Sequence, residues 1–317
     1  MSESISAEPV GGSTGDLASR AAEHGWAVVR LAGALGAEIQ GVNLANPDAA
    51  ELETIKALLH EHQVIFFPEQ TITTDEHVAL GERFGHVESH PNLKNPFTQH
   101  PKLFELAASH GGIADEWHTD ITFSAEPPLL SILKVVECPP VGGDTMWSSL
   151  DSAFAALSAP LQSLCEGMTA LHDAKPHNRP EQMAIHPMVR VHPVTGRKVL
   201  YVNEHFTRRI VELSAEESRV LLDYLTAWVQ KPRFTVRYRW QPNTVGIWDN
   251  RCTQHFVLND FQGERVIQRV TVMGDKPEGA EPRWEPYVRP GHRSATSQHD
   301  RQLLRFLQGR PYTVGDR

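Results

Sequence analysis

Apolar residues recur along the chain at both helix and strand spacings, which predicts a mixed fold. Residues 48–62 repeat leucine and isoleucine three and four positions apart, as expected for a helix with one buried face. The pairs Thr73–Glu76 and Ser214–Glu217 have the spacing of a capping box and predict the starts of two further helices. Short apolar or alternating runs predict strands at 26–42, 64–67, 130–136, 198–202, 234–240, 244–248 and 266–273.

The order of these segments indicates one β-rich α+β domain with peripheral helices, which we place at residues 16–281. A chain of 317 residues is compatible with one large domain. Residues 1–15 are rich in Ser, Gly and Glu, so we expect a flexible N-terminal tail. Residues 282–317 are rich in Pro, Arg and Glu, and we expect a C-terminal extension that lies over the surface.

Composition narrows the classes of partner. The chain has 30 Lys and Arg against 39 Asp and Glu, a net charge of −9, which counts against nucleic-acid binding because that needs a basic face. It has three cysteines, and none of them form a CxxC pair. The sequence shows neither the basic start and apolar run of a signal peptide nor an apolar run long enough to span a membrane. We therefore expect a cytoplasmic protein that binds neither nucleic acid nor membranes. The 17 histidines direct attention to metals.

Two sequences combine a histidine with an acidic residue two positions later, at His86-Val87-Glu88 and His118-Thr119-Asp120. Residues 117–123 have strand composition, and a strand directs residues two apart to one face, so His118 and Asp120 would converge. With a distant histidine, for which His255 is the candidate, they would form the 2-His-1-carboxylate set that binds Fe(II). The simpler alternative is a surface histidine beside a solvated aspartate.

Arg265 and Arg269 lie in a strand-like stretch, and their even separation directs both to one face about 13 Å apart. Two arginines on an otherwise apolar face are costly unless each meets an anion. The alternative is a pair of exposed arginines at a sheet edge.

Several longer phrases in a fixed order carry a more specific signal, and through them the chain resembles the TauD/TfdA family of Fe(II)/2-oxoglutarate-dependent dioxygenases. The resemblance runs from about Gly33 to Pro277 and implies a double-stranded β-helix (jelly roll) with flanking helices. The phrases are Trp117–Phe123, Gly142–Thr145, His192–Gly196, Val202–Glu204, Ile247–His255 and Gly274–Pro277.

The resemblance implies roles for the matching positions. His118, Asp120 and His255 would hold Fe(II) and leave room for 2-oxoglutarate and O2. Thr145 and Arg265 would bind the far carboxylate of 2-oxoglutarate. His90 and Arg269 would meet the anionic group of the prime substrate. The interval from His255 to Arg265 is one residue shorter than the family pattern, so the roles of the two arginines could be exchanged.

Departures from the sulfonate-oxidising members bear on the substrate. Ala114 stands where those members have an asparagine, and Leu93 where they have a tyrosine, which implies a wider pocket without a partner for an amine. Ile121 and Phe123 are further candidates for contact with the substrate. We therefore expect a small anionic substrate, a sulfonate, sulfate ester, phosphonate or carboxylate, whose organic part is larger than or different from taurine.

The implied reaction is hydroxylation of an aliphatic C–H bond, coupled to conversion of 2-oxoglutarate into succinate and CO2. A carbon–heteroatom bond would break when the hydroxylated carbon bears sulfur, oxygen or nitrogen. Two alternatives remain, a non-catalytic 2-oxoglutarate-binding protein of the same fold and a zinc hydrolase that uses the same ligands. We further expect a homo-oligomer, either a dimer or a tetramer.

Overall fold

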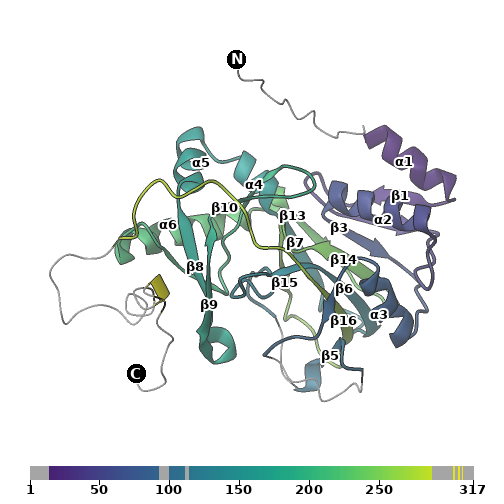
Figure 1. The fold of residues 1–317 in the computed structure, drawn as a ribbon. Helices are drawn as coiled ribbons and strands as arrows, with labels where there is room; N and C mark the ends of the chain where they lie inside the picture. The colour runs from purple at the N-terminus through teal and green to yellow at the C-terminus, as the bar shows by residue number, and fades with distance from the viewer. Residues whose placement is uncertain are drawn as a thin grey trace.

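A computed structural model describes residues 14–92, 100–110 and 114–287, together with residues 303, 306, 307 and 309. Its α-helices are α1 (Thr14–Glu23), α2 (Ala49–His62), α3 (Thr74–Glu82), α4 (Leu150–Ala155), α5 (Ala159–Glu166) and α6 (Ala215–Val229). Helices α1, α2 and α3 lie on one side of the molecule, and α5 and α6 on the other (Figure 1). Within the described residues, no helix is both long and apolar enough to span a bilayer.

Both predicted capping boxes are present. Thr73 accepts a hydrogen bond from the backbone of Glu76, and the Glu76 side chain accepts one from the backbone of Thr73. Ser214 and Glu217 pair in the same way at the start of α6. These bonds satisfy backbone N–H groups that a helix start would otherwise leave unpaired, so the sequence locates both helix starts correctly.

Among the described strands, the largest sheet runs in the order β1-β2-β3-β14-β6-β16-β4, with β5 paired to β16; β2 and β3 are parallel and its other described pairs are antiparallel. The predicted strand at 26–42 is in fact the antiparallel pair β1 and β2. The strands of this sheet are β1 (Ala27–Arg30), β2 (Ala37–Gln40), β3 (Val64–Phe67), β4 (Val87–Glu88), β5 (Leu103–Ala107), β6 (Pro128–Glu137), β14 (Val245–Asp249) and β16 (Val266–Met273).

Three smaller sheets complete the described strands. The sheet β13-β7-β15 combines β13 (Thr235–Tyr238), β7 (Thr145–Ser149) and β15 (Thr253–Val257). The sheet β12-β8-β9 combines β12 (Thr207–Ile210), β8 (Thr169–Ala174) and β9 (Arg179–Pro187), and β10 (Val189–Val191) pairs with β11 (Lys198–Leu200). The protein is therefore strand-rich with flanking helices, as the sequence predicts.

The central strands β3 and β14 of the large sheet are buried on both faces, and successive side chains of β3 point to opposite sides. Ile65 and Phe67 of β3 belong to the core cluster that includes α2 and α3. Val64 and Phe66 point to the opposite side, where the ring of Phe66 lies 5.1 Å from that of Trp147 on β7. Each such side chain contributes roughly 1.5–3 kcal/mol when fully buried, so this double-sided packing fixes the sheet β13-β7-β15 against the large one.

One predicted strand is wrong. Residues 117–123 form a single bridge at His118 and then a turn. The turn is set by Ile121, whose φ of 52° lies in the left-handed region, and the N–H of Ser124 closes it on the Ile121 carbonyl. A β-branched residue rarely adopts this conformation, so neither composition nor alternation could indicate it.

The described residues that follow Pro282 contact the main body. The backbone N–H of Arg283 donates to Gly167, and that of Tyr287 donates to Val211. Leu303 is buried beside Leu171 and Val211. At the other end α1 begins at Thr14, and residues 1–13 lie outside the described part.

Candidate active site

A cavity of about 680 Å³ lies between the large sheet and the sheet β13-β7-β15. Leu93 lies outside the described residues. Phe123 does not line the cavity but is buried behind it, with its ring 5.2 Å from that of Phe206 on the wall. All the other residues predicted for the site line the cavity: His90, Ala114, His118, Asp120, Ile121, Thr145, His255, Arg265 and Arg269.

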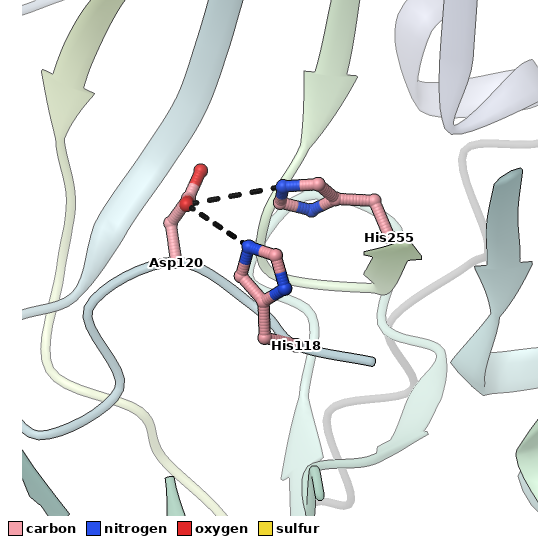
Figure 2. Close-up of side chains that lie close together, drawn as sticks. All are labelled: His118, Asp120 and His255. Atoms are coloured by element: carbon pink, nitrogen blue, oxygen red, sulfur yellow. Dashed lines mark ion pairs between the residues drawn. The ribbon is translucent and has the colours of Figure 1, made fainter. Parts of the chain in front are cut away.

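The two histidines of the predicted metal site are adjacent because the backbone pairs them. The N–H of each donates to the carbonyl of the other, at 3.1 Å from His118 and 2.8 Å from His255. Nε2 of His118 lies 3.8 Å from Oδ1 of Asp120, and Nε2 of His255 lies 3.9 Å from the same oxygen (Figure 2). Three donor atoms thus lie within 4.8 Å of one another, although residue 255 is far from the other two in sequence.

Hydrogen bonds orient this donor set. Nδ1 of His118 lies 2.7 Å from the carbonyl of Glu116 and must donate to it, so Nε2 keeps its lone pair toward Asp120. Nδ1 of His255 is buried without a hydrogen-bond partner among the described residues. The hydroxyl of Thr119 donates to the carbonyl of Thr253 at 2.8 Å, which ties the turn to β15.

The charge states favour a cation. Burial lowers the pKa of His118, and burial and then the neighbouring His118 lower that of His255 well below its usual range. Burial opposes ionisation of Asp120, but Arg269 and the two histidines hold the pKa of Asp120 well below its usual range. At neutral pH the site therefore offers two neutral imidazoles and one carboxylate, a set that fits Fe(II) and also Zn(II).

Arg265 is a buried cation with no anionic partner in the described part of the chain. It is only 7% exposed, and it donates to the carbonyl of Gly143 at 3.2 Å and to Oγ1 of Thr145 at 3.4 Å. It forms no ion pair with any residue that the structure describes, because Asp144 nearby pairs with Arg237 at 2.6 Å instead. Burial lowers the pKa of Arg265 to about 10, so it stays charged at neutral pH. Such a group fits a carboxylate of a bound ligand.

Thr145 can complete that contact. Its hydroxyl oxygen accepts from the indole N–H of Trp240 at 2.8 Å as well as from Arg265. Both lone pairs are then used, and the hydroxyl proton remains to donate to an anion in the cavity. The contact between Thr145 and Arg265 brings together the two residues that the sequence analysis expects to share one carboxylate.

Arg269 lies at the end of the cavity where His118, Asp120 and His255 meet. Its Nη1 donates to Oδ1 of Asp120 at 3.0 Å, and its guanidinium stacks over Phe104 at 5.6 Å. Nδ1 of His90 accepts from the backbone of Asn92 at 3.1 Å, so the proton of the neutral ring is on Nε2. Burial and then Arg269 lower the pKa of His90 to about 3. A cation and a neutral N–H donor therefore share this end of the cavity.

Sequence reasoning missed two further histidines on the wall. Nδ1 of His205 lies 2.5 Å from a carboxylate oxygen of Glu116, and its ring centroid lies 5.6 Å from that of His118. The ring of His177 lies 5.9 Å from His205 and 5.2 Å from His90. His205 directly follows the phrase Val202–Glu204, which was a usable signal, whereas nothing in the sequence around His177 marks it.

Comparisons with known proteins agree with this geometry. The family model described as "Taurine catabolism dioxygenase TauD, TfdA family" matches residues 27–271. An alpha-ketoglutarate-dependent (2-oxoglutarate-dependent) sulfate ester dioxygenase of Pseudomonas putida is 35% identical over 82% of this chain and 94% of its own length. An alkylsulfatase of Acinetobacter baylyi is 36% identical over 79% of this chain and 86% of its own length.

Among solved structures, a taurine dioxygenase from Burkholderia xenovorans superposes with a TM-score of 0.74. It is 36% identical and covers 83% of this chain and 96% of its own. The chain therefore belongs to the TauD, TfdA family and is a 2-oxoglutarate-dependent dioxygenase.

Proposed function

We propose that this dioxygenase uses Fe(II), 2-oxoglutarate and O2 to hydroxylate an alkyl sulfate ester at the carbon that carries the ester oxygen. The observation that carries the proposal is the placement of two arginines in one cavity: Arg265 is buried with no anionic partner among the described residues, and Arg269 lies beside the His/Asp/His set. Two anions of different kinds can then bind at fixed positions on either side of a metal.

His118, Asp120 and His255 would hold the iron through Nε2, Oδ1 and Nε2. Bound Fe(II) supplies activation of O2 coupled to oxidative decarboxylation of 2-oxoglutarate, which yields succinate and CO2. Arg265 and Thr145 would bind the far carboxylate of 2-oxoglutarate through charge-assisted hydrogen bonds. The burial of both residues excludes water from that contact.

His90 and Arg269 would bind the sulfate group, one as a neutral N–H donor and one as a cation. Ile121, Ala114 and the ring of Phe206 would contact the alkyl chain. Phe123 would support that wall from behind, and Leu93, outside the described residues, stays a sequence prediction for substrate contact. Because Ala114 offers only a methyl group, this wall binds a hydrocarbon better than an amine.

Hydroxylation at the proposed carbon gives an unstable product without further help from the protein. The carbon would carry a hydroxyl and a sulfate group, and the C–O bond to sulfate would break as the hydroxyl oxygen forms a carbonyl. The products are an aldehyde, inorganic sulfate and a proton. The names of the two relatives from Pseudomonas putida and Acinetobacter baylyi support a sulfate ester over a phosphonate or carboxylate.

The proposal also includes the fold type, the cellular compartment and the oligomeric state predicted from the sequence. The face-to-face sheets around the cavity support a double-stranded β-helix. Three cysteines without a disulfide support a reducing compartment, the cytoplasm. We also retain the homo-oligomer as a proposal.

The test is an anaerobic titration of metal-free protein with Fe(II) and 2-oxoglutarate, followed by the weak visible charge-transfer band of the chelate. Alkyl sulfates are then added with O2, and succinate, aldehyde and sulfate are measured. We expect the three products in equal amounts. Sulfate release without O2 or 2-oxoglutarate would indicate a zinc hydrolase, and a chelate band without succinate from any substrate would indicate a binding protein.

A further inference from the structure

The two carboxylate oxygens of Asp120 have different surroundings. Oδ1 faces His118, His255 and Arg269. Oδ2 points away from them and accepts a hydrogen bond from the hydroxyl of Ser131 at 2.9 Å. Ser131 lies on β6 and is 0% exposed, so no solvent competes for this bond.

The direction of that bond is fixed by two residues at the end of β14. The indole N–H of Trp248 can only donate, and it lies 3.0 Å from Asn250, so the amide oxygen of Asn250 must face it. The amide nitrogen of Asn250 then donates to Oγ of Ser131 at 3.0 Å. Ser131 is left with its own proton for Asp120, which when ionised can only accept. Every bond in this chain points toward the carboxylate.

The backbone holds the chain of bonds in place. Trp248 and Ser131 are paired residues of the antiparallel strands β14 and β6. The N–H of Asn250 donates to the carbonyl of Leu129 at 3.0 Å, which anchors the turn after β14 to the same strand. Trp248 and Asn250 are almost completely buried, so the three side chains form a rigid support behind Asp120.

We infer that Ser131 and Asn250 are positioning residues for the metal: they hold Asp120 with Oδ1 toward the two imidazoles and so set the affinity of the site for a divalent cation. This rests on the metal site of the proposed function. Residues that orient metal ligands from behind typically change affinity 10- to 100-fold when they are removed. Asn250 acts only through Ser131 and contacts neither the ligand oxygen nor the cavity.

The test compares Ser131→Ala with Ser148→Ala. Ser148 is also 0% exposed, and its hydroxyl donates to a neighbouring carbonyl, that of Val229, but it has no bond to Asp120. Affinity for Fe(II) is measured anaerobically on metal-free protein by competition with a chromophoric chelator, and thermal unfolding of the same samples is recorded. We expect Ser131→Ala to weaken Fe(II) binding about 10- to 100-fold and Ser148→Ala to leave it unchanged. Equal affinities in the two variants would overturn the inference.

Asn250→Ala and the double variant Ser131→Ala/Asn250→Ala test whether the hydrogen bonds run from Asn250 through Ser131 to Asp120. If Asn250 acts through Ser131, Asn250→Ala weakens Fe(II) binding in the wild type but adds nothing to Ser131→Ala. If the losses in Fe(II) binding free energy add in the double variant, Asn250 does not act through Ser131. Wild-type protein that binds no Fe(II) would refute the proposed metal site itself, whereas a wild type that binds and a Ser131→Ala variant that binds equally well would refute only this inference.

Discussion

Arg269 donates from Nη1 to Oδ1 of Asp120 at 3.0 Å, the oxygen that also faces the Nε2 atoms of His118 and His255. One carboxylate oxygen is therefore shared between the proposed metal site and the proposed substrate site. A metal at this oxygen would compete with Arg269 for it and leave the guanidinium available to an anion. Binding of metal and of an anionic substrate should consequently favour each other.

Asp120→Ala should abolish Fe(II) binding and turnover, because it removes the only carboxylate among the three proposed ligands and leaves Arg269 to repel the cation. The measurement is Fe(II) binding to metal-free protein together with succinate formation. Glu88→Ala is the matched control, since His86 and Glu88 have the same spacing, lie 3.0 Å apart and are exposed. Wild-type turnover by Asp120→Ala would remove Asp120 from the metal site.

Arg265→Ala and Arg269→Ala should weaken the binding of different anions, 2-oxoglutarate in the first variant and the alkyl sulfate in the second. A hydrogen bond to a charged group contributes about 1.5–3 kcal/mol, so each variant should lose roughly 10- to 100-fold in affinity for its own anion. Arg265→Ala should raise KM for 2-oxoglutarate far more than KM for the alkyl sulfate, and Arg269→Ala should do the opposite. Steady-state kinetics with each ligand varied in turn measures this. A reversed pattern would mean that the arginine roles are exchanged.

Ala114→Leu should shorten the alkyl chains that the enzyme accepts, because three extra carbons would project from the cavity wall. We expect kcat/KM to fall about tenfold or more for long alkyl sulfates and to change little for short ones. The series of chain lengths is measured for the wild type, for Ala114→Leu and for Ala108→Leu, a second alanine on the wall. A uniform loss at every chain length in Ala114→Leu would contradict a role in substrate selection.

His77 should make the fold sensitive to acid. It is fully buried, donates to the carbonyl of Ile132 at 3.0 Å, and burial lowers its pKa to about 4 from an ordinary 6.5. Below pH 6.5 the unfolded chain takes up a proton that the folded protein does not, so stability falls as the pH drops from 6.5 toward 4. The full difference corresponds to about 3 kcal/mol.

The free energy of unfolding should therefore decline with acid less steeply in His77→Gln than in the wild type. Urea titrations from pH 7 to pH 4.5 measure the difference. His86→Gln serves as the control, because that histidine is exposed and should leave the slope unchanged. Parallel curves for the wild type and His77→Gln would show that another group causes the acid sensitivity.

The sequence predicted those features that depend on interactions between residues close together in the chain. A capping box needs only residues three apart, so the starts at Thr73 and Ser214 were predictable. The all-apolar run 64–67 likewise indicated a buried strand, since both of its faces are covered. The arginines at 265 and 269 were expected on one face, and both line the cavity.

Longer-range features were not predictable in this way. The turn that follows Asp120 contains Ile121, whose positive φ is maintained by surrounding contacts rather than by the preference of the residue itself. His177 reaches the wall from the connection between β8 and β9, and only the tertiary fold brings it beside His90. The same holds for Ser131, whose role depends on strand pairing with β14.

One side of the strand β16 packs in the core of the protein, and the other side faces the cavity. Val270 and Val272 are buried on the side of α2 and α3, while Ile267 and Arg269 face the cavity. Because successive residues of a strand alternate sides, a slip of one position against β6 would bury Arg269 beneath the helices and place a valine in the cavity. Burial of the apolar side of β16 thus selects the one register in which Arg269 faces the cavity. A molecule with the other register would lose stability as well as the arginine of its site.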